Sequence, residues 1–339
     1  MSYRKINHDH VRTRPLANRE NKMNVNDIFP LDHQVEFDSE DLEELARRIV
    51  ETRRKGGQVI WMMGAHVLRA GNSRFIIDLM EWGVITHLAT NAAVAIHDFE
   101  LAFLGATLED VEFYIKDGSF GNWEEPGRFI NEAVGRGFRD KIGFGEAIGR
   151  LIEKEECGRM PYRKVSIFAA AYRLGVPATV HKGIGFDITD QHPSADFAAI
   201  GKTSGDDFLI FANSIAGLEG GVFLNLGSQV MGPEVYLKAL SIARNLACQQ
   251  GREIKRFTTA VFDLVPLGNW QKERDIVDWR KTGVMSDPRY YFRPLKSILI
   301  RTVKDGGRSF YIQGDFKHTV PCLYHKIVNI LDRERKELP

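Results

Sequence analysis

The chain has 339 residues, of which 43% are hydrophobic and 27% are charged, and its formal net charge is +1. This length suits one large α/β domain or two ordinary ones, and the composition is that of a soluble globular protein. A nearly neutral chain has no global field that attracts nucleic acid or an anionic membrane, so we expect neither as a partner.

The cysteines and the N-terminal composition favour the cytoplasm. Cys157, Cys248 and Cys322 are far apart and follow no metal-ligand spacing, which suits a reducing compartment better than a disulfide framework. Residues 1–24 contain no apolar run that could form a secretory signal or an anchor. No stretch of about 18 apolar residues occurs, which argues against a transmembrane helix. We therefore expect a cytoplasmic protein.

The N-terminal residues 1–38 are polar and irregular, and we expect them to form an extended arm. Such arms usually fray, and some dock on a neighbouring subunit. A helix is predicted from Ser39, because a serine N-cap and early acidic residues come first, and basic residues and Gly56 close the segment.

From residue 58 onward, short apolar segments alternate with amphipathic ones. The apolar segments, which are typical of buried strands, are 58–65, 85–90, 176–181, 220–227 and 256–264. Helical patterns fill the intervals between them, as in residues 72–83 and 232–251. This alternation predicts an α/β fold with a mostly parallel, Rossmann-like, doubly wound sheet covered by helices on both faces.

The C-terminal region is expected to break this pattern. The segments "SILIRTV" and "RSFYIQGD" flank the turn residues "DGG", and this pattern is typical of a β-hairpin. A final helix is expected from about Val320. No internal repeat or linker occurs, so residues 39–339 are predicted to form a single domain.

Polar residues follow every expected strand at its carboxyl end, where open parallel sheets bind ligands. These residues are, in chain order, His66, Gly71 and Asn72; Asn91, His97 and Asp98; the segment 181–196; the segment 227–234; and Asp263. Loops are polar in any case, but five polar loops at one edge of the sheet predict a ligand-binding cleft.

The loop after the third expected strand is the densest polar stretch. His181, Asp187, Asp190 and His192 offer ligands acceptable to zinc, manganese or iron, yet their spacing matches no motif with known mechanics. The alternatives are polar contacts to a substrate, or a capped turn that ends at Pro193. We assign no metal ligand. "GIGFD" lacks the third glycine of a dinucleotide fingerprint, and no Walker lysine pattern occurs.

His97 and Asp98 lie side by side in the otherwise apolar stretch "TNAAVAIHDFELAFLG". A buried charge is costly unless it is paired, so the two residues either face a polar partner or line a site. Asp98 alone is explained by the positive end of a helix dipole. His97 is not explained in that way.

Taken in order, these loops resemble the deoxyhypusine synthase family over about residues 55–335. The segments that carry the resemblance are "GAHVLRAG" with "NSRFIIDLM", "TNAAVAIHD", "HKGIGFD", "LGSQVMGPEV" and "IQGDFKHTVP". They keep the family's residues at Asp98, Gly183, Asp187, Gly227, Asp315 and Pro321.

The resemblance implies an enzyme that binds NAD between the subunits of a homotetramer and transfers an aminoalkyl group through a lysine imine. It implies catalytic roles for Lys296, Asp187, His192 and His97, and substrate contacts from His181, Asp98 and Asp190. The implied cofactor-binding residues are Gly64, Ala65, His66, Asn91, Ala92, Ala93, Lys182, Gly227, Asp263, Asp315 and Phe316.

Departures from the family change the expected substrate. Ile96 and His97 occupy positions where the family has glutamates for a polyamine, and Pro233 replaces a histidine. Lys182 stands in place of an aspartate at the ribose, which indicates NADP, a different pose or no dinucleotide. We expect a transferase for a small amine or amino-acid-like substrate, without efficient deoxyhypusine synthesis. The alternatives are a metal-dependent hydrolase or lyase that uses residues 181–192, and a non-catalytic nucleotide-binding homo-oligomer.

Overall fold

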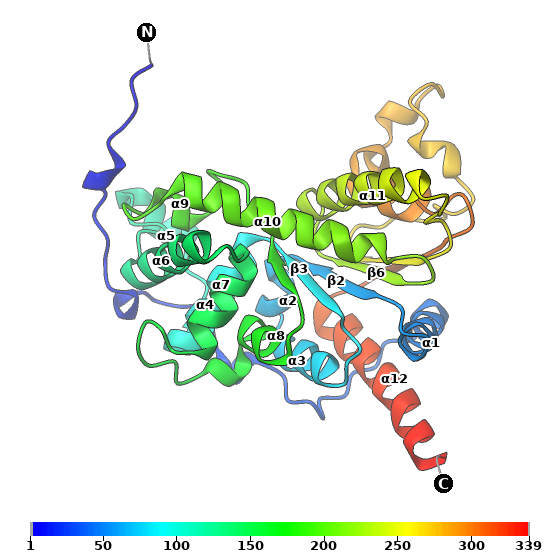
Figure 1. Ribbon diagram of the computed structural model, residues 1–339, viewed down its shortest axis with the longest axis horizontal. Coiled ribbons are helices and arrows are strands. Elements are labelled where there is room, and N and C mark those ends of the chain that lie inside the picture. The colour runs from blue at the N-terminus through cyan, green and yellow to red at the C-terminus, as the bar shows by residue number, and fades with distance from the viewer. Residues whose placement is uncertain (1–2, 338–339) are drawn as a thin grey trace.

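The computed structural model describes residues 3–337 and is built on a six-stranded sheet with the order β5-β3-β2-β6-β7-β8 (Figure 1). The strands are β2 (Val59–Met63), β3 (His87–Thr90), β5 (Ala178–Val180), β6 (Val222–Leu226), β7 (Thr258–Asp263) and β8 (Arg308–Gln313). Every neighbouring pair in this sheet is parallel. The expected parallel, Rossmann-like α/β architecture is therefore confirmed.

Twelve α-helices connect and cover these strands within the described residues. They are α1 (Glu40–Arg54), α2 (Ala65–Arg69), α3 (Ser73–Glu81), α4 (Ala92–Leu104), α5 (Val111–Tyr114), α6 (Glu124–Asp140), α7 (Phe144–Glu153), α8 (Ile167–Leu174), α9 (Ile188–Gln191), α10 (Phe197–Ala216), α11 (Met231–Gln249) and α12 (Phe316–Glu337). Two short strands, β1 (Met23–Asn24) and β4 (Ala106–Thr107), form a separate antiparallel pair.

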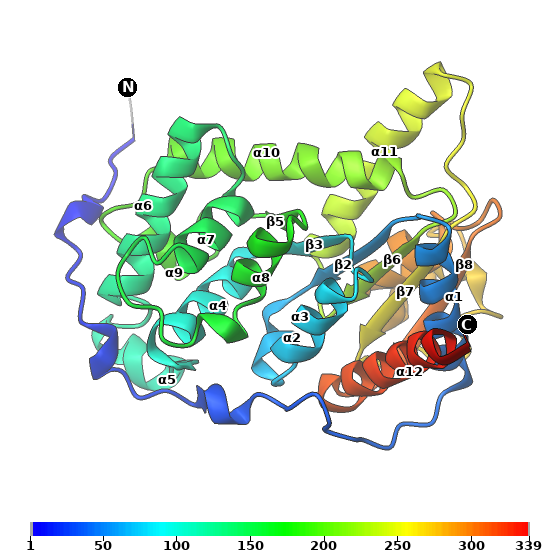
Figure 2. The ribbon, with the colours of Figure 1, turned by 60° about the horizontal axis from the view of Figure 1, so that its bottom comes forward.

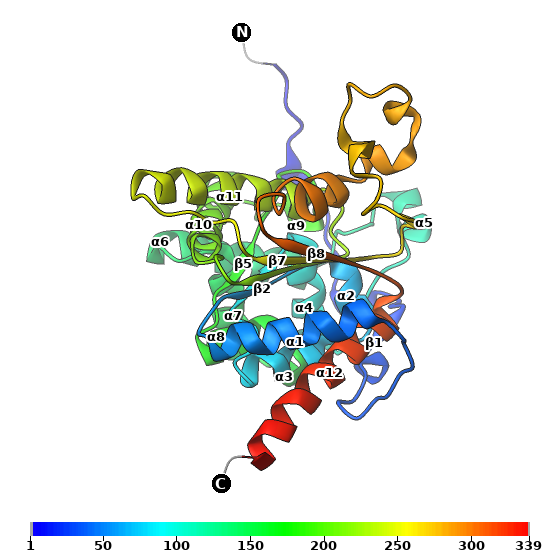
Figure 3. The same ribbon diagram turned by 90° about the vertical axis from the view of Figure 1, so that its right-hand side faces the viewer.

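Helices cover both faces of the sheet, which is why its strands are apolar throughout. On β2, Trp61 packs into one hydrophobic core while Ile60 and Met62 pack into the other. Figure 3 shows α10 and α11 on one side of the sheet and α1, α3 and α12 on the opposite side. A strand buried on both faces has no polar alternation, so its continuous apolar run is the expected pattern.

The C-terminal hairpin prediction is wrong. Residues Leu295–Ile300 form a π-helical segment (η9), and β8 joins the sheet parallel to β7. The segment packs against β7, where the Thr259 hydroxyl donates to the carbonyl of Ile298 over 3.0 Å. A short apolar run such as "SILI" suits a buried strand or a buried helix equally well, and periodicity alone does not separate the two.

The N-terminal arm lies along its own chain. In Figure 2 it follows the outside of the helical group that contains α4, α5 and α6 and then passes to α1. Leu16, Met23 and Ile28 are buried, and Met23 pairs with Thr107 in the small sheet. The predicted α1 starts at its Ser39 cap, whose hydroxyl accepts from the backbone N–H of Leu42 over 3.2 Å.

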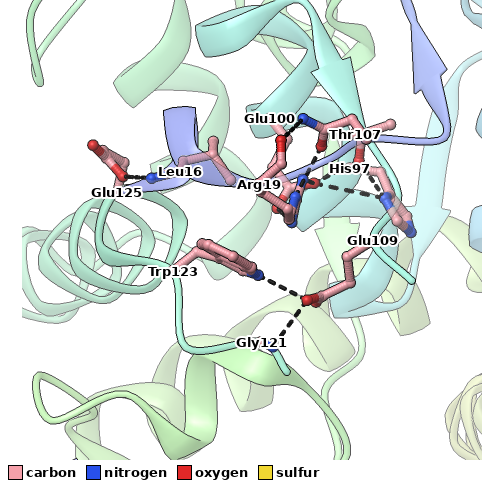
Figure 4. Close-up of polar contacts among 10 residues, drawn as sticks. Leu16, Arg19, His97, Glu100, Thr107, Glu109, Gly121, Trp123 and Glu125 are labelled. Carbon is pink, nitrogen blue, oxygen red and sulfur yellow. Dashed lines mark hydrogen bonds and ion pairs between the residues drawn. The ribbon is translucent and has the colours of Figure 1, made fainter. Parts of the chain in front are cut away.

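A buried ion pair fastens the arm to α4 (Figure 4). The Arg19 guanidinium donates to both carboxylate oxygens of Glu100, over 2.8 and 2.7 Å, and both side chains are 1% exposed. Three residues before Arg19, the backbone N–H of Leu16 donates to the Glu125 carboxylate over 2.7 Å. The arm thus contributes both apolar surface and a buried charge to the fold.

Between residues 3 and 337, no helix is long and apolar enough to cross a membrane.

We predict that Arg19→Ala lowers the free energy of unfolding by about 3–5 kcal/mol, because the Glu100 charge stays buried without its partner. Arg14 is the matched control in the same arm, since its ion pair with Asp117 is half exposed. Arg14→Ala should cost about 0–1 kcal/mol. Chemical denaturation of the full chain measures both values, and equal losses in the two variants would contradict this account.

Candidate functional site

A cleft of about 1360 Å³ runs along the carboxyl edge of the sheet. The turns after β2, β3, β5, β6, β7 and β8 all contribute to its lining, and α10 forms part of its wall. Small-molecule sites usually measure about 300–1,000 Å³, so this cleft can hold an extended ligand. Its position is the one that open α/β sheets use for ligands.

The strand order identifies the switch point beneath this cleft. When the six strands are numbered along the chain, the sheet has the order 3-2-1-4-5-6, which is that of dinucleotide-binding folds. Connections leave the central pair β2 and β6 in opposite directions, which opens a crevice between their carboxyl ends.

Two glycines meet at that crevice. Gly64 follows β2 and donates its N–H to the carbonyl of Leu226 over 2.9 Å, and a Cβ at Gly64 would overlap the carbonyl oxygen of Gly227. Gly227 follows β6 with a φ of +62°, and a Cβ there would lie 2.8 Å from the ring of Phe316. The absence of a side chain at Gly64 lets the two turns approach this closely, and Gly227 allows the left-handed backbone and the packing of Phe316.

The turn after β6 is held in shape by short-range hydrogen bonds. Asn225 donates its side-chain amide to the carbonyl of Ser228 over 2.9 Å, and the Ser228 hydroxyl accepts from the N–H of Gly232 over 2.8 Å. Gln229 reaches the carboxylate of Asp263 at the end of β7, over 3.2 and 3.3 Å. The turn and the carboxylate after the next strand are therefore fixed relative to each other.

An unpaired cation lies in the cleft at Arg69, in α2. Within residues 3–337, the Arg69 guanidinium forms no ion pair with a carboxylate, and its Nε is buried without a hydrogen-bond partner. Burial lowers the pKa of Arg69. The pKa of the neighbouring His66 is also lowered, by burial and then by Arg69, against an opposing effect of Asp315. The arrangement favours an anionic group of a ligand at this point.

The loop after β5 is organised around Lys182. Its side chain is fully buried, with Nζ 3.1 Å from Asp187 and 2.8 Å from Asp190. The same two aspartates form the capping box of α9, and Asp190 also accepts from the N–H of Gly185 over 2.7 Å. Burial raises the pKa of Asp187, and Lys182 opposes that shift. These carboxylates are committed to the loop, and the Lys182 ammonium is not available to a ligand.

His192 and Lys296 lie away from the cleft. The Nδ1 of His192 is 2.7 Å from the Ser194 hydroxyl, and its Nε2 is 3.5 Å from Glu124. The Nζ of Lys296 lies 3.3 Å from the centroid of the Tyr290 ring. The structure therefore brings neither residue to the ligand-binding edge.

His97 and Asp98 both have structural partners. Asp98 accepts from the Ser166 hydroxyl over 2.5 Å and from the backbone N–H of Ile167 over 2.8 Å, so it stabilises the start of α8. Burial raises the pKa of Asp98 to about 7. The Nδ1 of His97 lies 2.6 Å from the Thr107 hydroxyl, which itself donates to Glu100 (Figure 4). Burial lowers the pKa of His97 to about 4.

The structure brings eight of the predicted site residues to the cleft: His66, Asn91, His181, Lys182, Gly227, Asp263, Asp315 and Phe316. It does not place the remaining ten in the lining: Gly64, Ala65, Ala92, Ala93, His97, Asp98, Asp187, Asp190, His192 and Lys296. Among the described residues, no group of three or more His, Cys, Asp or Glu side chains is arranged to hold a metal ion.

Sequence reasoning assigned no individual role to five polar residues of the lining, namely Arg69, Ser204, Ser228, Gln229 and Glu234. It placed the last three at the predicted cleft only as part of the segment 227–234. Arg69 follows His66 by one helical turn, so this basic residue beside a candidate loop was a usable signal. Ser204 lies inside α10, where the sequence shows only an ordinary covering helix.

Residues 43–118 match the protein family described as "Arginine dihydrolase ArgZ-like, C-terminal, Rossmann fold". This segment runs from α1 into the turn after α5. No curated protein sequence matches the chain.

Solved structures share the fold. The apo structure of ArgZ, an arginine dihydrolase from the ornithine-ammonia cycle in cyanobacteria, has a TM-score of 0.51 and 14% identity, over 86% of this chain and 33% of ArgZ. Unliganded AgrE has a TM-score of 0.50 and 15% identity, over 89% of this chain and 34% of AgrE. AgrE with ornithine and NAD+ has a TM-score of 0.47 and 14% identity, over 90% of this chain and 35% of AgrE. The chain spans about a third of the length of these proteins.

These findings overturn the resemblance to deoxyhypusine synthase, because the matching family and structures are those of ArgZ and AgrE. The aminoalkyl transferase activity and the link to polyamines, which depended on that resemblance, are wrong as well. Glycine and aspartate after successive parallel strands are shared by Rossmann-like folds in general, so their order along the chain did not identify one family.

Proposed function

We propose that this chain binds NAD in the cleft at the carboxyl edge of the sheet and uses it on an amino acid. The observation that carries the proposal is the strand order with its two glycines in contact at the switch point. The cleft beside them is large enough for an extended ligand, and Gly227 belongs to its lining.

The residues around the switch point suit a dinucleotide. The turn from Gly227 to Gln229 would hold the diphosphate, since it lies in the cleft lining and leads to the N-terminus of α11. Asp263 ends the strand that follows this turn, the position from which a carboxylate accepts a ribose hydroxyl in such folds. Carboxylates at Asp263 and Asp315 disfavour a 2′-phosphate, and Lys182 cannot offset them, so NAD is preferred to NADP.

The opposite half of the cleft suits the amino acid. Arg69 would bind its carboxylate, because a guanidinium without a protein partner matches that group in charge and shape. Asn91 and His181 lie in the same lining and offer polar contacts to an amino group. The bound nicotinamide supplies a hydride acceptor for the substrate carbon.

The division into an arm of residues 1–38 and a domain of residues 39–339 stays a prediction, as does the homotetramer.

We predict that the full chain binds NAD+ more tightly than NADP+, and that Asp263→Asn weakens NAD+ binding roughly tenfold to hundredfold. A hydrogen bond to a charged group contributes about 1.5–3 kcal/mol, and asparagine keeps the acceptor that Leu264 uses. Asp32→Asn is the control, since Asp32 is exposed and remote from the cleft lining. Calorimetry measures all three proteins. If the unmodified chain shows no binding of NAD+ at millimolar concentration, the proposed function is disproved.

We further predict that L-ornithine or L-arginine binds the NAD+-saturated chain and that Arg69→Gln reduces this affinity about thirtyfold or more. Losing a charged partner for a carboxylate costs about 2–5 kcal/mol. Arg69→Lys should retain part of the affinity, and NAD+ binding should change little in both variants. Arg69→Gln with unchanged amino-acid affinity would remove Arg69 from the site, and no binding of either amino acid would contradict the substrate class.

A further inference from the structure

Four polar side chains form a hydrogen-bonded series beneath α10, beside the cleft. The Nε2 of His181 lies 3.1 Å from the Thr179 hydroxyl, which lies 2.9 Å from the Nε2 of His87. The Nδ1 of His87 lies 2.8 Å from the hydroxyl of Ser214 on α10. The series starts at the cleft lining and ends at a half-buried residue.

The sheet register accounts for this alignment. Thr179 pairs with Ala89 across β5 and β3, and Ala89 belongs to the core on the α10 side of the sheet. Residues two apart on an extended chain share a face, so His87 and His181 point to that side as well. Both rings meet the Phe211 ring edge-to-face, with centroids 5.5 and 5.0 Å apart. The polar series thus passes through an otherwise apolar layer.

Both imidazoles are neutral in the folded chain. Burial lowers the pKa of His181 to about 3, and burial together with His181 lowers the pKa of His87 to about 3. A neutral imidazole carries one proton, so each ring has one donor nitrogen and one acceptor nitrogen. The Thr179 hydroxyl has one proton as well.

The Thr179 hydroxyl contacts only these two rings among the described residues, so its own proton must go to one of them. With that condition, two arrangements satisfy all three hydrogen bonds. In the first, His181 Nε2 donates to Thr179, Thr179 donates to His87 Nε2, and His87 Nδ1 donates to Ser214. In the second, each of these bonds runs in the opposite direction. His87 and His181 therefore always carry their protons on opposite ring nitrogens, and a change at one ring forces a change at the other.

We propose that His181 is the proton-exchanging side chain of the cleft, and that Thr179 and His87 are positioning residues that set its tautomer and relay its proton. The Nδ1 of His181 has no partner among the described residues, which leaves it for a ligand. This inference rests on the proposed function only for the identity of that ligand.

The relay balances one proton in and one proton out. His181 Nδ1 takes a proton from the ligand, and its Nε2 proton passes to Thr179. The Thr179 proton passes to His87 Nε2, the His87 Nδ1 proton passes to Ser214, and the Ser214 proton passes to solvent. The series then stands in its second arrangement, and the reverse movement restores the first.

Nuclear magnetic resonance of the full chain labelled with 15N-histidine tests the proposal through long-range correlations that report each ring's tautomer. His87→Gln and His181→Gln assign the signals. We expect opposite tautomers for His87 and His181, retained in Thr179→Ser and lost in Thr179→Val. Thr203→Val is the control, because the buried Thr203 hydroxyl bonds only to the backbone of its own helix. Protons on the same nitrogen of both rings, or unchanged tautomers in Thr179→Val, would overturn the proposal.

A ligand titration of the same samples connects the series to the cleft. An ammonium group that donates to His181 Nδ1 selects the first arrangement, so L-ornithine added to the NAD+-saturated chain should move both rings to it together. If the ligand binds and His87 does not respond, the relay is wrong. Calorimetry on these samples separates that outcome from a failure of ligand binding, which would count against the proposed function and leave the tautomer result standing.

Discussion

The contact between Gly64 and Gly227 determines how closely the two central turns of the sheet approach. The Gly64 N–H bonds to the carbonyl of Leu226, and neither glycine has room for a Cβ. Because β2 and β6 are the pair from which connections leave in opposite directions, this contact forms the floor of the crevice. The turn after β6, the carboxylate of Asp263 and the unpaired Arg69 take their positions around it.

Charge is distributed unevenly along the cleft. Arg69 and His66 follow β2, while Asp263 and Asp315 follow β7 and β8. The Lys182 ammonium, which sequence reasoning placed at a cofactor, instead holds two aspartates of its own loop. A buried ion pair of this kind keeps the loop in one conformation, and removing either charge would leave the other uncompensated. His181 itself is held at the end of β5, where its N–H donates to the carbonyl of Thr90 over 2.8 Å.

The alternation of apolar and amphipathic segments was enough to predict the parallel sheet, since strands that are buried on both faces appear in the sequence as continuous apolar runs. It failed at Leu295–Ile300, where a short apolar run formed a π-helix. Ten of the eighteen predicted site residues lie outside the cleft lining, for a different reason. Asp98, Asp187 and His192 are polar residues near strand ends, but their partners, Ser166, Lys182 and Ser194, turn them away from the cleft. Pairing depends on side-chain direction, which spacing along the chain does not reveal.

The central claim is that a dinucleotide lies across the switch point, and a crystal structure of the chain with NAD+ tests it most directly. The account predicts the diphosphate over the turn from Gly227 to Gln229, beside Gly64, with a ribose hydroxyl at Asp263. A dinucleotide bound elsewhere on the molecule, or the same cleft left empty at saturating NAD+, would contradict it.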